Sequence, residues 1–470
     1  MGMDLLDLEF VQALSSELRD GVRIIKAEVL VQPVECPFCK AADPYRHDTR
    51  EQEFADAPVR GVPVRIKFDR RRYRCRACRK TFFEPILGFS SKRNMTQRLV
   101  HYVARDSLIR TFADVSRDVS LDVQTIRGVF FDFSDWLRAN HPIDTPSKMG
   151  IDEASRAKKL CTVITDLERR DYVEMLPTRD LKPVKAYLRD IKNKERITVV
   201  AMDLYTGFIA AIGTHIPNAV RVADRFHVVR YGQKAVANAQ LHARKTLSPG
   251  GRLAMFRKRS ILSTARKRLT PEDAVKVDEV MAQFPLLAQV NDARERFLTI
   301  YESDSRRAAG FGLDAWLGTL TPEVAEYFKE LVSIVTRNRE VILNYFDHKY
   351  TNAFTEAANG ISKLMEKMGR GYGFEVMRVK LLYGKRGQVV DLSAYDVDRN
   401  DSSGGFTTEL VYSAPRPSPP RTRKPSASTG RRGPNVREVE ALVEAGYYDL
   451  GNSEIANELE PLIASFARQY

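Results

Sequence analysis

The chain has 470 residues, 43% of them hydrophobic, and this length exceeds what one hydrophobic core usually organises. Its formal net charge of +14 favours a polyanionic partner such as nucleic acid, although a merely basic soluble protein has the same balance. No run of about 18 apolar residues occurs and the first ten residues carry acids, so we expect a cytoplasmic protein without a membrane anchor.

Residues 1–90 predict a small zinc-ribbon module preceded by a leading helix. Cys36 and Cys39 form one CxxC pair and Cys75 and Cys78 form another, so four thiolates can complete a tetrahedral Zn²⁺ site. Alternating apolar residues between the pairs predict strands. Redox motifs or unrelated thiols are the alternative, but neither pair lies in a thioredoxin-like context. The fifth cysteine, in an apolar run, is predicted to be a buried strand residue, Cys161.

The second cysteine pair is surrounded by cations in the segment RRRYRCRACRK. Positive side chains beside a zinc site suit contacts with phosphates. Arg74 and Arg76 are therefore candidates for DNA binding.

Residues 91–145 predict several short helices with the spacing of a helix-turn-helix unit. Asp122 is the expected N-cap of the second helix. The positions expected to be buried are Phe112, Val115, Val119, Leu121, Ile126 and Val129. Such a unit lays its second helix in the DNA major groove, which makes Gln124, Thr125 and Arg127 candidates for contacts with bases or phosphates. A plain three-helix packing unit has the same periodicity and stays open.

Residues 146–231 predict the element order β-β-β-α-β-α-β. From 232 to 345 the chain has helical periodicity, interrupted at SPGG and AGFGLDAW, and is expected to be an all-helical insertion. Residues 346–390 would return to the α/β core, with a helix capped by Asn352. Residues 391–470 have the composition of a flexible basic tail, with a possible short helix at VREVEALVEAG.

Three acids follow this element order. Asp152 ends the first strand, Asp203 ends the fourth, and Glu356 lies early in the later helix. An RNase H-like fold places its acids in this way, with the first and fourth strands adjacent. Clustered carboxylates can hold two Mg²⁺ or Mn²⁺ ions, which is the arrangement needed to cleave and join phosphodiesters.

Five segments also resemble the ISL-three family of bacterial insertion-sequence transposases over residues 30 to 390, namely GIDE, VAMD, PNAVRVADRFHVVR, TNAFTEAANGISK and RGYGFE. The resemblance implies that Asp152, Asp203 and Glu356 are the family's catalytic Asp-Asp-Glu acids. It places an Asp-x-x-His signature on Asp224 and His227. It also implies a multidomain protein with a zinc ribbon, a helix-turn-helix domain and an RNase H-like catalytic domain that carries a helical insertion.

The resemblance further implies double-stranded DNA partners, both terminal inverted repeats and target DNA. A homodimer or higher oligomer on DNA, associated with the bacterial nucleoid, is expected. Catalytically silent DNA binding by a domesticated transposase, and metal-dependent nuclease activity without strand transfer, are the alternative functions. Asp224 could replace Asp203 as the second metal ligand. His227 could position DNA or stabilise the site, or could be a buried histidine bonded to Asp224.

Overall fold

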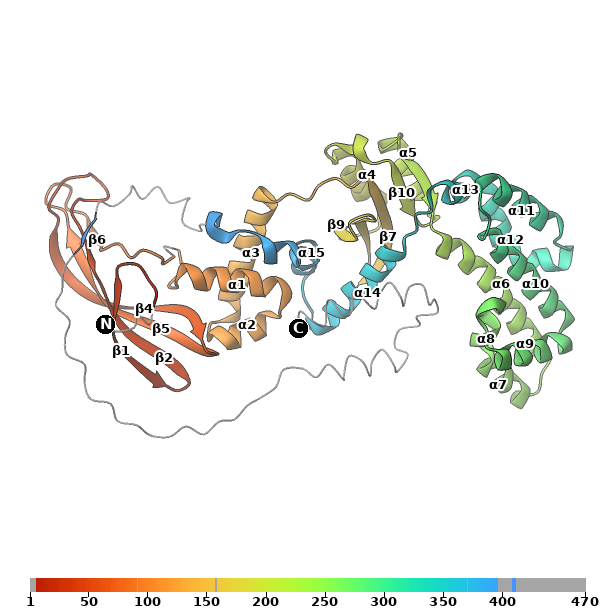
Figure 1. Ribbon diagram of the computed structural model, residues 1–470, viewed down its shortest axis with the longest axis horizontal. Helices are drawn as coiled ribbons and strands as arrows, with labels where there is room; N and C mark the ends of the chain where they lie inside the picture. Colours follow the sequence, from red (N-terminus) through yellow and green to blue (C-terminus); the bar gives the residue numbers. More distant parts are fainter. Residues whose placement is uncertain (1–5, 91, 157–158, 370, 396–407, 411–470) are drawn as a thin grey trace. The chain divides into compact units, whose positions relative to one another are not determined.

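The computed structural model, shown in Figure 1, describes residues 6–90, 92–156, 159–369, 371–395 and 408–410. These residues divide into two units. The first holds residues 6–142 and the described residues from Val379 onward, and the second holds Ile143–Arg378. The helix predicted at VREVEALVEAG lies outside the described residues. Among the described helices, none has the length and apolar character needed to cross a membrane.

A five-stranded sheet lies in the N-terminal part of the first unit. Its order is β1-β2-β5-β4, and β6 pairs with β5. These strands are β1 (Val11–Arg19), β2 (Val22–Val29), β4 (Tyr45–Val59), β5 (Val62–Arg74) and β6 (Thr81–Phe83). A separate short pair joins β3 (Val31–Pro33) to β12 (Thr408–Leu410) in antiparallel orientation.

The leading helix predicted for this module is wrong, because β1 occupies its place. Asp20 and Gly21, with φ of 49° and 77°, connect β1 to β2 in a two-residue turn. Positive φ at both turn residues is typical of the type I′ hairpin, which matches the twist of antiparallel strands. The Asp-Gly pair is the sequence signal for this hairpin.

Three helices follow this sheet in the first unit, as the sequence predicts for residues 91–145. They are α1 (Gln97–Ile109), α2 (Phe112–Val119) and α3 (Val123–Asn140). Asp122 is the N-cap of α3, and its side chain accepts a hydrogen bond from the backbone N–H of Gln124. The expected core positions are buried except for the half-buried Leu121.

The second unit contains a sheet in the order β11-β10-β7-β8-β9. Its elements follow the predicted sequence: β7 (Lys148–Arg156), β8 (Lys159–Asp166), β9 (Asp171–Leu176), α4 (Leu181–Asp190), β10 (Val199–Met202), α5 (Thr206–His215) and β11 (Val220–Ala223). β7, β10 and β11 are parallel, whereas β8 runs antiparallel to its neighbours. Cys161 is buried in β8, as predicted.

The two faces of this sheet are covered by different helices. Side chains alternate between the faces along a strand. Ile151 and Met202 join an apolar cluster with residues of α4 and α5, whereas α14 (Ala353–Met368) contacts β7 and β8. A Cβ atom at Gly150 would overlap the hydroxyls of Thr165 and Thr355. This close approach seats α14, and Glu356 with it, on β7.

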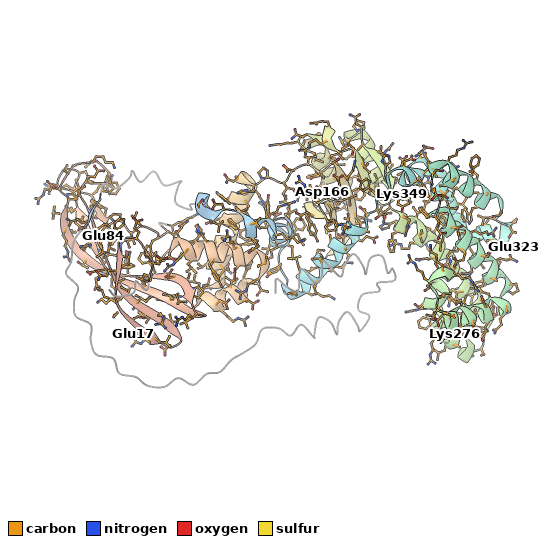
Figure 2. All side chains as sticks on the ribbon, in the orientation of Figure 1. Glu17, Glu84, Asp166, Lys276, Glu323 and Lys349 are labelled. Carbon is orange, nitrogen blue, oxygen red and sulfur yellow. The ribbon has the colours of Figure 1, made fainter. Side chains whose placement is uncertain are left out.

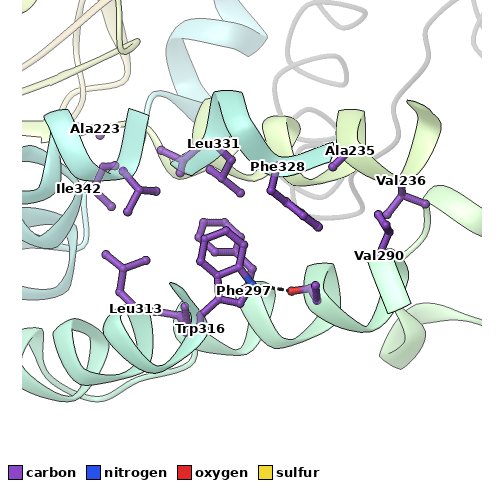
Figure 3. Close-up of a cluster of buried hydrophobic side chains, with 14 of the residues drawn as sticks. Ala223, Ala235, Val236, Val290, Phe297, Leu313, Trp316, Phe328, Leu331 and Ile342 are labelled. Carbon is purple, nitrogen blue, oxygen red and sulfur yellow. Dashed lines mark hydrogen bonds between the residues drawn. The ribbon is translucent and has the colours of Figure 1, made fainter. Parts of the chain in front are cut away.

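Eight helices between β11 and α14 form the helical part of the second unit: α6 (Arg225–Lys245), α7 (Pro249–Arg257), α8 (Arg259–Ser263), α9 (Pro271–Gln283), α10 (Pro285–Ile300), α11 (Arg306–Gly318), α12 (Pro322–Arg337) and α13 (Arg339–His348). Their shared core includes Phe297, Trp316 and Phe328 (Figure 3). The indole N–H of Trp316 donates a hydrogen bond to the Ala293 carbonyl over 2.8 Å.

The structure corrects one of the two predicted interruptions in this part. The chain breaks between α6 and α7 at SPGG, but AGFGLDAW lies inside α11. A Cβ at Gly310 would touch Arg339 and Leu343, and one at Gly312 would touch Ile300. Both contacts are at ordinary van der Waals distance, so these glycines are regular positions of a continuous helix and do not mark a turn. α6 passes through residue 232 without a break.

A buried lysine caps a helix end in the first unit. Lys380, on α15 (Phe374–Tyr383), donates hydrogen bonds to the carbonyls of Ser107 and Arg110 at the C-terminus of α1. Its ammonium also lies 5.0 Å from the centroid of the Phe112 ring. The last carbonyls of a helix have no partner within it, and the buried Nζ of Lys380 supplies the hydrogen-bond donors that they need. Lys380 therefore fixes α15 against α1.

We predict that Lys380→Met lowers the free energy of unfolding of the first unit by about 1–3 kcal/mol, because buried carbonyls lose their donor. Urea denaturation of a Trp316→Phe background, followed through Trp136 on α3, measures this unit. The exposed Lys385→Met is the control. An unchanged midpoint in Lys380→Met would contradict the capping role.

The difference in unfolding free energy between wild type and Lys380→Met should depend on pH. Burial lowers the pKa of Lys380 to about 7, whereas an unfolded lysine titrates near 10.4. Between these values the unfolded chain binds more protons, so the stability of the wild type relative to Lys380→Met should rise with pH. Below pH of about 7 the difference should be constant.

Candidate active site and zinc site

The four paired cysteines meet at one end of the β4–β5 hairpin. Their Sγ atoms all lie within 4.8 Å of one another, and no disulfide joins them. The two knuckles repeat one backbone pattern, in which Lys40 N–H donates to Cys36 O and Arg79 N–H donates to Cys75 O. Four thiols at this separation suit one tetrahedral Zn²⁺ ion. The long paired strands β4 and β5 account for the wide sequence gap between the pairs.

The cations around the second cysteine pair divide into two groups. Arg70, Arg71 and Arg72 contact groups within the fold: backbone carbonyls, Gln52, Thr81 and the acids Glu84 and Asp48. Arg76 is exposed and its guanidinium lies 5.0 Å from the Tyr45 ring centroid. The half-buried Arg74 donates to the Arg79 carbonyl. Only part of this basic segment is therefore available to a partner.

The helix-turn-helix candidates lie on the first turns of α3. Gln124 and Arg127 are exposed and Thr125 is half-buried. Ile126 and Val129 point into the core from the other side of the helix. This face of α3 is open to a ligand.

Three aspartates follow adjacent positions on three parallel strands. Ile151 on β7 pairs with Met202 on β10, which in turn pairs with Ala223 on β11. The residue after each of these is an aspartate, namely Asp152, Asp203 and Asp224. Asp203 and Asp224 directly follow their strands, but the prediction that Asp152 ends its strand is wrong, because β7 continues to Arg156 in its pairing with β8. Because the strands are parallel and in register, the three carboxylates come to the same end of the sheet.

His227, on the first turn of α6, lies at the centre of the acids. Its Nδ1 is 2.9 Å from Asp224 Oδ2 and 3.7 Å from Glu356 Oε1, and its Nε2 is 3.9 Å from Asp203 Oδ2. Asp224, His227 and Glu356 offer ligand atoms within 4.8 Å of one another. The four predicted acids thus surround the imidazole of His227, with Asp152 close enough to affect its charge.

The acids are buried unequally. Asp152 and Asp224 are 5% and 1% exposed, whereas the side chain of Asp203 is 29% exposed. Burial, followed by the charge of Asp224, raises the pKa of Glu356 to about 8, and burial raises that of Asp152 to about 6. Burial opposes protonation of His227, but the hydrogen bond to Asp224 and the nearby acids raise its pKa to about 9. A cation beside such crowded carboxylates would favour their charged forms.

Asn352 connects α14 to two strands of the site. Its backbone N–H donates to Asp224 Oδ1 over 3.2 Å, and its side-chain amide donates to the Ile151 carbonyl over 2.8 Å. The Thr355 hydroxyl donates to Asn352 Oδ1. Asn352 occupies the N-cap position, but the predicted side-chain cap is wrong because its amide is used in these contacts.

Asn359 contacts the first aspartate directly. Its Nδ2 donates to Asp152 Oδ2 over 2.9 Å, while its Oδ1 is buried without a hydrogen-bond partner. Asn352, Glu356 and Asn359 are spaced i, i+4 and i+7, so they lie on one face of α14. That spacing within TNAFTEAANG is the signal by which sequence reasoning could have found the two asparagines.

Comparisons with known proteins match both the zinc site and the acid site. The ISL3 transposase domain, described as a transposase, matches residues 149–381, and a zinc-finger of transposase IS204/IS1001/IS1096/IS1165 matches residues 32–78. A transposase for insertion sequence element IS1001 from Bordetella parapertussis is 26% identical over 265 residues, 54% of this chain and 64% of that relative. The match thus spans slightly less than two thirds of the relative. With its cysteine knuckles and its aspartate-bearing sheet inside the matched regions, the chain belongs to the ISL3 family of transposases.

Proposed function

We propose that the protein binds the terminal inverted repeats of an insertion sequence and catalyses cleavage and transfer of DNA strands. Asp152, Asp203 and Glu356 would hold two Mg²⁺ or Mn²⁺ ions. The observation that carries this proposal is the gathering of these acids around His227, whose Nδ1 is 3.7 Å from Glu356 and whose Nε2 is 3.9 Å from Asp203.

The donor set fits hard divalent cations. Carboxylate and amide oxygens are the ligands such ions prefer, and the buried, unpartnered Oδ1 of Asn359 adds a further oxygen beside Asp152. When bound, a pair of ions activates the attacking oxygen and stabilises the leaving oxygen of a phosphodiester. Water as the attacking group gives cleavage, and a DNA 3′-hydroxyl gives strand transfer.

The sheet supports an RNase H-like catalytic domain. Its first strand, β7, lies between β8 and the fourth strand, β10, and β8 is the antiparallel member. This arrangement brings Asp152 and Asp203 side by side, as expected for an RNase H-like fold, in which the first and fourth strands are adjacent. The helices from α6 to α13 would be its insertion.

The contacts of Asp203 and Asp224 favour Asp203 as the second metal ligand. Asp224 already uses both oxygens, with Oδ2 bonded to His227 and Oδ1 accepting from Asn352 N–H. Asp203 Oδ1 accepts from its neighbour Leu204 N–H, while its Oδ2 is 3.9 Å from His227. We therefore assign Asp224 and His227 to positioning the site, with the imidazolium balancing the acids.

The first unit would bind the inverted repeats. Gln124, Thr125 and Arg127 on α3 would read the major groove as a helix-turn-helix recognition helix, and Arg74 and Arg76 would contact phosphates. The exposure of Gln124, Arg127 and Arg76 supports this assignment. Joining the two ends of an element calls for at least a homodimer on double-stranded DNA.

We expect Asp203→Asn to abolish nicking of duplex DNA carrying the element's ends in Mg²⁺ or Mn²⁺, while DNA binding persists. Asp224→Asn should lower activity by about 10–100-fold without abolishing it, because Asp224 would position the metal ligands and not bind the metal itself. The reverse ranking would assign the metal to Asp224. Binding without nicking by the wild type would indicate a silent DNA-binding protein, and nicking without joined products a nuclease.

Removal of the hydrogen bond from Asn359 to Asp152 should weaken metal binding and thereby lower activity. Asn359→Ala is predicted to reduce nicking by about 10–100-fold and to raise the Mg²⁺ concentration needed for half-maximal rate. Ser362→Ala is the matched control, because this buried hydroxyl on α14 donates only to the Asn359 carbonyl among the described contacts. A lower rate with an unchanged Mg²⁺ requirement would rule out the positioning role.

The zinc assignment is tested by metal analysis of purified protein. Wild type should contain about one zinc per chain, and Cys39→Ser should lose most of it, because the site needs four thiolates. Cys161→Ala, outside the knuckles, should keep its zinc. Chelation should lower the unfolding temperature of wild type, since binding to the folded state stabilises it. Zinc retained in Cys39→Ser would refute a four-cysteine site.

A further inference from the structure

One long segment of the second unit contains no acidic residue. Between Asp224 and Glu272 the chain has twelve Lys and Arg residues and no Asp or Glu, although acids number 61 among the 470 residues. The segment forms α6, α7, α8 and the turn that follows. Arg230 lies close enough to the acid site to lower the pKa of Glu356, but the cations from the end of α6 onward belong to the helical part.

Acids from other helices neutralise only some of these cations. Four of them form ion pairs: Lys234 with Glu330, Lys258 with Glu279, Arg266 with Asp278 and Lys267 with Glu302. Five others have no ion pair with a carboxylate in the described part of the chain: Arg244, Lys245, Arg252, Arg257 and Arg259. We call these five residues, with Phe256, the α6–α8 surface.

The α6–α8 surface is held in place. Phe256 is 40% exposed, and the guanidiniums of Arg259 and Arg244 lie 4.4 and 5.2 Å from its ring centroid. Arg252 donates to the carbonyls of Leu247 and Lys245. Cations fixed in this way lose less conformational entropy when they bind a partner.

We propose that the α6–α8 surface binds the phosphate backbone of duplex DNA at a distance from the metal site. This proposal rests on the proposed function, because α6 begins at the site with Asp224 as its N-cap and ends at this surface. A helix of 21 residues is about 30 Å long. That length corresponds to about nine base pairs of duplex, at roughly 3.4 Å each.

Duplex DNA fits this surface better than an acidic protein or an anionic membrane. The same helix would connect it to a site that acts on DNA, and rigid guanidiniums suit phosphate oxygens. Contacts with phosphates carry no sequence information. The surface would therefore add affinity and orientation to the duplex.

The test compares two triple variants of the full-length protein with equal charge change. Arg252→Gln/Arg257→Gln/Arg259→Gln removes surface cations. Lys276→Gln/Arg296→Gln/Lys329→Gln is the control. Each of these cations lies outside α6–α8 and pairs with an acid on its own helix, namely Asp273, Asp292 and Glu326. Lys276 is labelled in Figure 2. Dissociation constants for a duplex carrying the element's end are measured over a range of salt concentrations.

The surface variant should weaken binding and flatten the plot of log affinity against log salt by about one unit per lost phosphate contact. The control should match wild type. Arg257→Glu, at an exposed residue, should also weaken binding and guards against misfolding of the triple variant. A duplex with fewer than about nine base pairs beside the reacting bond should bind wild type and surface variant equally.

An unchanged salt dependence in the surface variant and in Arg257→Glu, with wild type still binding and nicking DNA, would overturn this inference alone. Loss of binding to phosphatidylserine vesicles with DNA binding unchanged would overturn it in favour of a membrane. Wild type that fails to bind the duplex at all would contradict the proposed function itself.

Discussion

Four carboxylates crowd around one imidazole in the second unit, and the surrounding fold holds them there. Like charges at this separation repel one another, and burial strengthens the repulsion. Burial, and then the neighbouring acids, raise the pKa values of Asp152 and Glu356, whereas burial opposes protonation of His227 and the acids raise its pKa. A protein keeps such an arrangement only where packing and hydrogen bonds impose it, which is typical of a functional site.

Each support of the site comes from a different part of the chain. Parallel register places three aspartates at the end of one sheet, Gly150 lets α14 approach, and Asn352 ties α14 to Asp224 and β7. His227 belongs to α6, which extends without a break into the helical part. The site and the helical part therefore share a rigid element, so DNA held along α6 would keep a fixed position relative to the acids.

Much of this could be predicted from the sequence because the signals are local. Strand periodicity gave the order of elements, and the paired cysteines gave the zinc knuckles. The helical spacing of Asn352, Glu356 and Asn359 places them on one face of α14, but it does not give their partners, since Asn359 meets Asp152 only after α14 packs on β7. The leading helix was predicted wrongly because the Asp-Gly turn that decides the β1–β2 hairpin was overlooked. The glycines of α11 suggested a break, but the helix continues through them.

The central claim is that Asp152, Asp203 and Glu356 hold the catalytic ions, with Asp224 and His227 outside the coordination shell. It is tested most directly by a crystal structure of the protein bound to an element end in Mn²⁺, using anomalous scattering to locate the metal. The account predicts two Mn²⁺ peaks about 4 Å apart, with Asp152, Asp203 and Glu356 as protein ligands. A peak coordinated by Asp224 and His227, with Asp203 free, would contradict it.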